Sequence, residues 1–146
     1  MAEKDYFGEM LAMQHQLQCD SYGADPFTLE GEELMDWIRW NMLACEDELH
    51  EALAETGWKP WATSNHVDAK AFVHELVDAW HFFMNLLLCV GCDSSEFYAA
   101  YCEKHDLNAK RQADGYDGIA GKCKVCGRAL DDPHVKCTED RCEYFN

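Results

Sequence analysis

The chain has 146 residues, enough for one domain with its own core. Its 28 acidic residues outnumber 12 basic ones and give a net charge of -16, which excludes non-specific nucleic-acid binding because the protein's field repels phosphate backbones. It has neither a run of about 18 apolar residues for a membrane span nor an apolar signal-peptide core at its start, so we expect a cytoplasmic protein that binds no membrane.

The first expected helix runs from Asp5 to Gln18, where apolar residues recur at helical spacing. Gln14 and Gln18 lie four residues apart and therefore share one face of this helix. They are either ordinary surface glutamines or a pair of amides that faces a ligand. Residues 21–31 contain two glycines and a proline and are expected to form a loop.

A long amphipathic helix is expected from Glu32 to Glu55, ended by Gly57 and Pro60. Its broad apolar stripe consists of Leu34, Trp37, Ile38, Met42, Cys45, Leu49 and Leu53. The segment that follows, Trp58-Lys59-Pro60-Trp61, places two tryptophans around a lysine. These tryptophans either close over a ligand or are ordinary core aromatics.

The third expected helix begins near Ser64 or Asn65 and continues to about Val90. It is nearly all apolar from Ala71 to Leu88, so we expect it to be central to the fold and its few polar residues to be buried or to face a pocket. Those on one side of the helix are Asp78, His81 and Asn85. His81 is either a satisfied core histidine or, because it lies beside Asp78, a functional residue.

Two acidic pairs at helical spacing, Glu48 with Glu51 and Glu75 with Asp78, lie on these two helices among apolar residues. Four carboxylates in such surroundings repel one another and resist burial unless they are protonated or a cation lies between them. Carboxylate oxygens suit Mg²⁺, and Mg²⁺ suits phosphate chemistry. One pair alone would be a solvated helix face, whereas two pairs favour a Mg²⁺ site.

A fourth helix is expected after the capping box Asp93-Ser94-Ser95-Glu96. Lys104, Asn108 and Arg111 recur on it at helical spacing, as a stripe of hydrogen-bond donors in an otherwise acidic protein. Taken alone, this stripe would be a solvated surface. We expect residues 1–118 to form an all-α bundle of four or five helices.

Residues 119–146 read as a separate, zinc-ribbon-like tail. Cys123 and Cys126 are followed by Cys137 and Cys142, and two short cysteine pairs separated by a loop are typical of tetrahedral zinc coordination. The total of nine cysteines is odd, which suits a reduced compartment and a metal site better than disulfides. We therefore expect one structural Zn²⁺ on these four thiolates.

Four stretches together resemble the dimeric dUTPase branch of the all-α, MazG-like nucleoside triphosphate pyrophosphohydrolases. They are residues 10–14, the Glu48–Glu51 pair with the segment 58–61, residues 75–82 and residues 101–116. The segment 75–82, Glu-Leu-Val-Asp-Ala-Trp-His-Phe, is close to the ExxD-x-x-His-Phe segment of that branch, and 101–116 is similar to its Lys-x-x-x-Asn-x-x-Arg-Gln-x-x-Gly-Tyr motif. The order and spacing of these stretches are specific for the branch, and the missing second-domain insertion resembles its short, phage-type versions.

The resemblance implies a role for each matching residue. The residues expected to hold two or more Mg²⁺ ions, which Mn²⁺ can replace, are Glu48, Glu51, Glu75 and Asp78, with Glu51 as general base. The residues expected to bind the phosphates are Lys59, Lys104, Asn108, Arg111 and Tyr116. The residues expected near the sugar and the base are Gln14, Gln18, Trp61, His81 and Asn85.

The expected reaction is the cleavage of a deoxynucleoside triphosphate, dUTP first, to the monophosphate and pyrophosphate by a homodimer in the host cytoplasm. Gln18 stands where the family often has asparagine, so dCTP, a modified pyrimidine or a purine nucleotide remain alternatives. A different class of function is also open. In it, the chain is a non-catalytic, zinc-containing helical module that recruits a partner.

Overall fold

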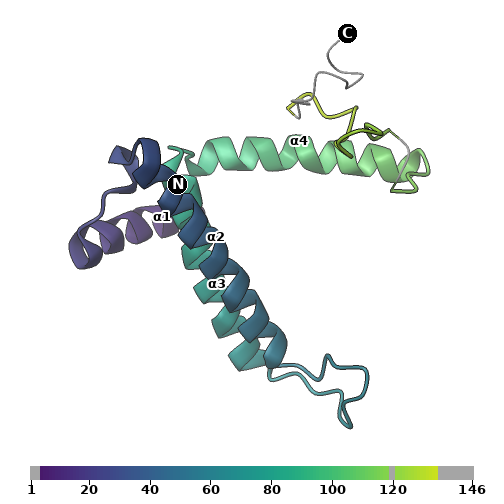
Figure 1. The fold of residues 1–146 in the computed structure, drawn as a ribbon, viewed down its shortest axis with the longest axis horizontal. Coiled ribbons are helices and arrows are strands. Elements are labelled where there is room, and N and C mark those ends of the chain that lie inside the picture. The colour runs from purple at the N-terminus through teal and green to yellow at the C-terminus, as the bar shows by residue number, and fades with distance from the viewer. Residues whose placement is uncertain (1–3, 119–120, 135–146) are drawn as a thin grey trace. The chain divides into compact units, whose positions relative to one another are not determined.

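The computed structural model describes residues 4–118 and 121–134. The described chain is all-α, as the sequence predicts, and Figure 1 shows its helices. In chain order they are α1 (Tyr6–Leu17), the π-helix η1 (Gln18–Tyr22), the 3₁₀-helix η2 (Pro26–Thr28), α2 (Gly31–Ala54), α3 (Ala69–Cys89) and α4 (Ser94–Ala113). The chain consists of two compact units, and the boundary between them falls between Phe97 and Tyr98, inside α4. The domain boundary expected after residue 118 stays a prediction.

The first unit is built on the pairing of α2 and α3, which lie side by side in Figure 1. The segment between them turns the chain back, and two backbone hydrogen bonds close it, from Gly57 N to His66 O (2.8 Å) and from Asp68 N to Glu55 O (3.0 Å). Because the two helices carry the acidic pairs, their pairing brings Glu48 and Glu51 to Glu75.

The third helix starts later than expected. Its cap is Asp68, whose side chain accepts hydrogen bonds from the backbone N–H groups of Lys70 and Ala71. The residues just before it are extended, and Val67 forms a β-bridge with Thr56. A carboxylate caps a helix as well as Ser64 or Asn65 would, and the bridge keeps those earlier residues out of the helix.

The first helix is longer than expected, because α1 passes directly into the π-helix η1 instead of a loop. The N–H groups of Gly23 and Ala24 both reach back to the carbonyl of Gln18. Gly23 ends the segment with a φ of 66°, a left-handed conformation that glycine adopts without strain. Single π-helical turns often occur at functional sites, and this one contains Gln18.

The core of the first unit joins α1 to the end of α3. Leu11, Met84 and Leu88 are buried together, with Phe7 and Trp80 packed against them. Much apolar surface on the same helices stays exposed nevertheless. The exposed residues of α2 and α3 include Met35, Trp40, Met42, Leu43, Leu49, Val73 and Val77. The chain by itself therefore covers only part of the apolar stripe that the sequence predicts on the second helix, since Met42, Leu49 and Leu53 stay exposed.

The fourth helix begins at the expected capping box. The Asp93 side chain accepts from Glu96 N (2.9 Å), and the Glu96 side chain accepts from Asp93 N (3.2 Å). No single helix in the described part of the chain is both long and apolar enough to cross a membrane.

Candidate active site

A cavity of about 980 Å³ opens in the first unit between α1, η1, α2 and α3. Its size suits a nucleotide-sized ligand. Six of the residues that the sequence singles out line it: Gln14, Gln18, Glu48, Asp78, His81 and Asn85. The amide side chains and one carboxylate from each acidic pair therefore line the same cavity.

The amide side chains of the cavity form a continuous hydrogen-bonded row. The imidazole Nδ1 of His81 lies 2.6 Å from Gln14 Oε1, and Gln14 Nε2 donates to Asn85 Oδ1 (2.8 Å). Asn85 Nδ2 then donates to Asn41 Oδ1 (2.8 Å), and Asn41 Nδ2 donates to the backbone carbonyl of Trp37 (2.8 Å). Gln14, Asn85 and Asn41 are all buried, so each bond replaces one that water would otherwise make.

Sequence reasoning missed Asn41 as a member of this site. The signal was an asparagine four residues after Trp37, inside the apolar stripe of the second helix, where a polar residue must find a partner. The Trp37 indole N–H also donates to the backbone carbonyl of Asn85 (3.2 Å), so α2 and α3 are joined here by side-chain bonds from both helices.

Gln18 differs from the other amides of the cavity. Its exposed fraction is only 8%, and its side chain makes no hydrogen bond to any residue that the structure describes. The amide is not sealed off, because no fully buried side-chain nitrogen or oxygen of the described residues lacks a partner, so it reaches the open space of the cavity, where water or a ligand can satisfy it. The glutamine pair that the sequence places on one face of the first helix thus faces the cavity and not bulk solvent.

Three of the four carboxylates expected at the metal site converge, and Asp78 lies outside this group. Oxygens of Glu48, Glu51 and Glu75 all lie within 4.8 Å of one another. Burial raises the pKa of Glu48, and the negative charges of Glu51, Asp78 and Glu75 raise it further. This cluster is a set of hard oxygen donors under mutual repulsion, and such a donor set fits Mg²⁺ or Mn²⁺.

The two loop residues expected at the substrate are not brought to the cavity. Trp61 is 76% exposed, and Lys59 holds its ammonium 5.8 Å from the centre of the exposed Trp58 ring. The alternative that these tryptophans are core aromatics does not hold in the single chain. A role of Lys59 and Trp61 in binding stays a prediction.

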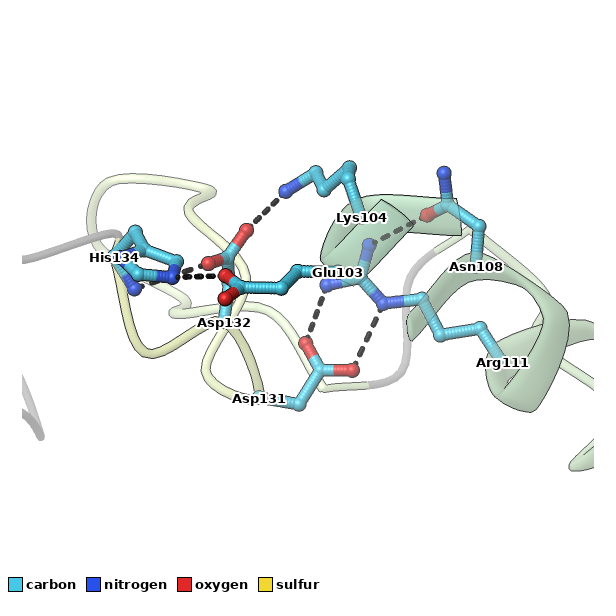
Figure 2. Close-up of polar contacts among 7 residues, drawn as sticks. All are labelled: Glu103, Lys104, Asn108, Arg111, Asp131, Asp132 and His134. Carbon is cyan, nitrogen blue, oxygen red and sulfur yellow. Dashed lines mark hydrogen bonds and ion pairs between the residues drawn. The ribbon is translucent and has the colours of Figure 1, made fainter. Parts of the chain in front are cut away.

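The donor stripe of the fourth helix lies in the second unit, where tail carboxylates already engage it (Figure 2). Arg111 donates two hydrogen bonds to Asp131, of 2.8 and 2.5 Å, and a third to Asn108 of 3.3 Å. Lys104 forms an ion pair with the buried Asp132. These cations hold the pKa of Asp131 and Asp132 below the ordinary value.

Four of the five expected phosphate-binding residues therefore lie together in the second unit, and Lys59 belongs to the first. The Arg111 guanidinium also lies 5.7 Å from the ring centre of Tyr116, whose backbone N–H donates to the Arg111 carbonyl (2.9 Å). The structure does not support the alternative that this stripe is only a solvated surface. Their contact with phosphate stays a prediction.

The tail is described only in part. Cys123 is buried against Cys126 and Leu130, and the Gly127 N–H donates to the Cys123 carbonyl (2.8 Å). The Val125 N–H also points at the Cys123 sulfur, at 3.4 Å. Such a tight turn presents cysteine sulfurs as in zinc sites. The other two expected ligands, Cys137 and Cys142, lie outside the described residues.

The fold and the site define an all-α protein with a carboxylate cluster beside an amide-lined cavity. A family model described as dUTPase matches residues 7–97, which include that cavity and all four expected Mg²⁺ ligands. The chain belongs to this dUTPase family of nucleotide pyrophosphohydrolases.

Curated relatives come from phages. The chain is 28% identical to a dCTP pyrophosphatase of Enterobacteria phage T4 over 78% of this chain and 84% of the relative. A dCTP pyrophosphatase of Enterobacteria phage LZ5 is 27% identical over 58% of this chain and 63% of that relative. A DNA replication protein of phage T4 is 29% identical over 74% of this chain but only 36% of its own length. No solved structure matches the chain.

Proposed function

We propose that the chain hydrolyses a pyrimidine deoxynucleoside triphosphate, accepting dCTP and dUTP, to the monophosphate and pyrophosphate in a Mg²⁺-dependent reaction. The observation that carries this proposal is the shared cavity, in which Glu48 and Asp78 lie with the amides of Gln14, Gln18 and Asn85. Carboxylates suit the metal-bound phosphates, and amides suit the pairing edge of a base. Family membership and the dCTP pyrophosphatase relatives support the same substrate class.

Glu48, Glu51, Glu75 and Asp78 would hold the ions, which when bound neutralise the triphosphate and lower the pKa of a water molecule. Glu51 takes a proton from the attacking water as general base. The water oxygen forms a bond to the α-phosphorus, and the bond from this phosphorus to the bridging oxygen breaks, so that pyrophosphate leaves. His81 lies at the sugar, and the amides lie at the base.

Lys104 and Arg111 stabilise the negative charge that grows on the leaving pyrophosphate, with Asn108, Tyr116 and Lys59 as further phosphate ligands. Arg111 already shows the two-pronged geometry that this role needs, because it binds both oxygens of the Asp131 carboxylate. A guanidinium binds carboxylate and phosphate through the same fork.

The protein works as a homodimer or a dimer of dimers in the host cytoplasm. The support is the exposed apolar surface on α2 and α3, where Met42, Leu43 and Leu49 are each about half exposed. Large apolar side chains left exposed along two paired helices favour a contact with another chain. A second copy that packs helix against helix covers it.

Pyrophosphate release from the purified full chain tests the proposal. With Mg²⁺ we expect release from dCTP and dUTP, little from purine deoxynucleotides, and none in EDTA. Release of single phosphates would contradict the family reaction, and a purine nucleotide as best substrate would contradict the proposed base class. No release under any condition would instead favour the non-catalytic module.

A further inference from the structure

The hydrogen bond at the end of the buried amide row determines which end of each amide donates and which accepts. A backbone carbonyl only accepts, so the end of Asn41 that faces the Trp37 carbonyl must be the NH₂ group. The Asn41 oxygen then faces Asn85, whose NH₂ group must donate to it, and the Asn85 oxygen in turn faces Gln14. Each amide in the row is thereby fixed in one orientation.

The last member of the row is a histidine whose tautomer follows from the same argument. The Gln14 oxygen faces Nδ1 of His81 at 2.6 Å, so Nδ1 must carry a proton and donate. In the neutral ring the other nitrogen, Nε2, then holds a lone pair and accepts. No residue in the described part of the chain bonds to Nε2, and His81 lines the cavity.

We propose that Asn41 is a positioning residue, which fixes the polarity of the Gln14–Asn85 amide row and holds His81 with its proton on Nδ1 and Nε2 as acceptor. The tautomer stands on the geometry alone. Its consequence for the substrate rests on the proposed function: the cavity offers one fixed order of donors and acceptors, so a bound nucleotide meets a site that need not reorganise. With this anchor Gln14 and Asn85 cannot turn over to suit a ligand, whereas Gln18, which lies outside the row, can still turn over to suit cytosine or uracil.

Long-range ¹H–¹⁵N spectra of the uniformly labelled full chain, recorded where the histidines are neutral, report the tautomer of each ring. His81→Gln assigns the His81 signals. We expect a protonated Nδ1 and an unprotonated Nε2 in the wild type, and a mixture of both tautomers in Asn41→Leu. A wild-type ring with its proton on Nε2 overturns the proposal, even if the Asn41 variant fails to fold.

Trp37→Phe is the matched control, because it removes the indole N–H bond to Asn85 but keeps the carbonyl that anchors Asn41. It should leave the His81 tautomer as in the wild type, and an effect equal to that of Asn41→Leu would mean that packing, not polarity, is responsible. In turnover, Asn41→Leu should raise KM about tenfold and change kcat less than about twofold, since the carboxylates are untouched. An equal loss in kcat, or no change in KM, contradicts the positioning role.

A second observation, in the other unit, carries an independent inference. The adjacent carboxylates Asp131 and Asp132 occupy the two cations that the proposed function assigns to phosphate, one cation each (Figure 2). Asp132 is held in place, since its other oxygen accepts from the His134 backbone N–H (3.1 Å) and its side chain is buried. A pair of neighbouring anions on Arg111 and Lys104 imitates two neighbouring phosphates.

We infer that the Asp131–Asp132 segment is an autoinhibitory contact, which competes with the polyphosphate of the substrate for Lys104 and Arg111. This inference rests on the proposed phosphate role of the two cations. Substrate must displace the carboxylates before the cations can bind phosphate, so the contact lowers apparent affinity without entering the reaction.

Steady-state kinetics of the full chain with dCTP test this inference. Asp131→Asn and Asp132→Asn together should lower KM about tenfold and leave kcat within about twofold. Asp131→Asn alone, at a half-exposed position, should give part of the effect if the double variant folds poorly. Asp114→Asn, an exposed residue beyond α4, controls for the loss of negative charge and should not change KM. An unchanged or raised KM in the Asp131 variant overturns the inference.

The variant Lys104→Ala shows whether only the autoinhibition inference is wrong or the proposed function is wrong as well. If it raises KM while the aspartate variants have no effect, Lys104 binds phosphate and only the autoinhibitory contact is wrong. If it changes neither KM nor kcat, Lys104 has no role in catalysis. The assignment of Lys104 to phosphate binding and the autoinhibition inference are then both wrong.

Discussion

The carboxylate cluster gives a prediction in which one substitution has opposite effects with and without metal. Oxygens of Glu48, Glu51 and Glu75 lie within 4.8 Å of one another. Two unit charges at that distance repel by about 1 kcal/mol even at the dielectric of water, and by more at a protein surface. Glu48 takes part in two of the three pairs, so Glu48→Gln relieves about 2 kcal/mol of repulsion in metal-free protein.

The sign of this effect follows from the raised pKa of Glu48. A carboxylate whose folded pKa lies above the ordinary value of 4.5 destabilises the fold once it is ionised, and the penalty is complete above the folded pKa. At neutral pH in EDTA the variant should therefore melt about 4–8 °C above the wild type. Below pH 4.5, where the glutamate is protonated in both states, the difference should vanish.

Mg²⁺ should reverse the order. The ion binds the native cluster and stabilises the folded wild type, while the variant has lost one oxygen ligand and binds it less tightly. Thermal melting of both proteins, in EDTA and in millimolar Mg²⁺, measures the crossing. Glu46→Gln, an exposed carboxylate on the same helix outside the cluster, should show neither effect. A Glu48→Gln protein that melts below the wild type in EDTA, or that gains as much from Mg²⁺, refutes the reasoning.

Four further predictions follow from other parts of the molecule. Glu51→Gln should lower kcat about a hundredfold or more with the helical circular dichroism intact, and an unchanged rate removes Glu51 from the mechanism. Sedimentation should give a dimer or tetramer, and a mass near the 16.8 kDa of one chain at micromolar concentration excludes both. Metal analysis should find one Zn²⁺ per chain, lost when Cys123 and Cys126 are both changed to serine, so zinc retained by that protein disproves the assignment. Gln18→Asn, which shortens the buried amide without a protein partner, should shift the ratio of kcat/KM for dUTP over dCTP in favour of dUTP, and a constant ratio shows that Gln18 does not contact the base.

The local part of this structure could be predicted from the sequence because helical spacing is a local property. Residues three or four apart share a helix face, so the pairing of Glu48 with Glu51 and the common side of His81 and Asn85 needed no tertiary information. The capping box at Asp93 is local for the same reason. The resemblance to a known family then indicated which helix faces meet.

What the sequence did not reveal depends on contacts between distant segments. Asn41 gains its meaning from Asn85, 44 residues later, and looked like a polar interruption in an apolar stripe. Asp131 lies 20 residues after Arg111 in an irregular segment, where no periodicity indicates which way a side chain faces. The start of α3 at Ala69 was missed because Asp68 competed with two equally good caps and a bridge between Thr56 and Val67 decided the outcome.

Glu48 and the tail aspartates Asp131 and Asp132 respond to protons in opposite ways, because the pKa of Glu48 is raised and the pKa values of the two aspartates are lowered. Asp131 and Asp132 have lowered pKa values, so their contacts with Arg111 and Lys104 persist above the ordinary value of 3.8 and are lost only as pH falls further. Under the inferred autoinhibition, we therefore expect a competing polyanion, and not a physiological change of pH, to release them. A chain with a net charge of -16 repels that polyanion until cations have gathered on its carboxylates. Under the proposed function we therefore expect metal to bind the Glu48 cluster before, or together with, the triphosphate.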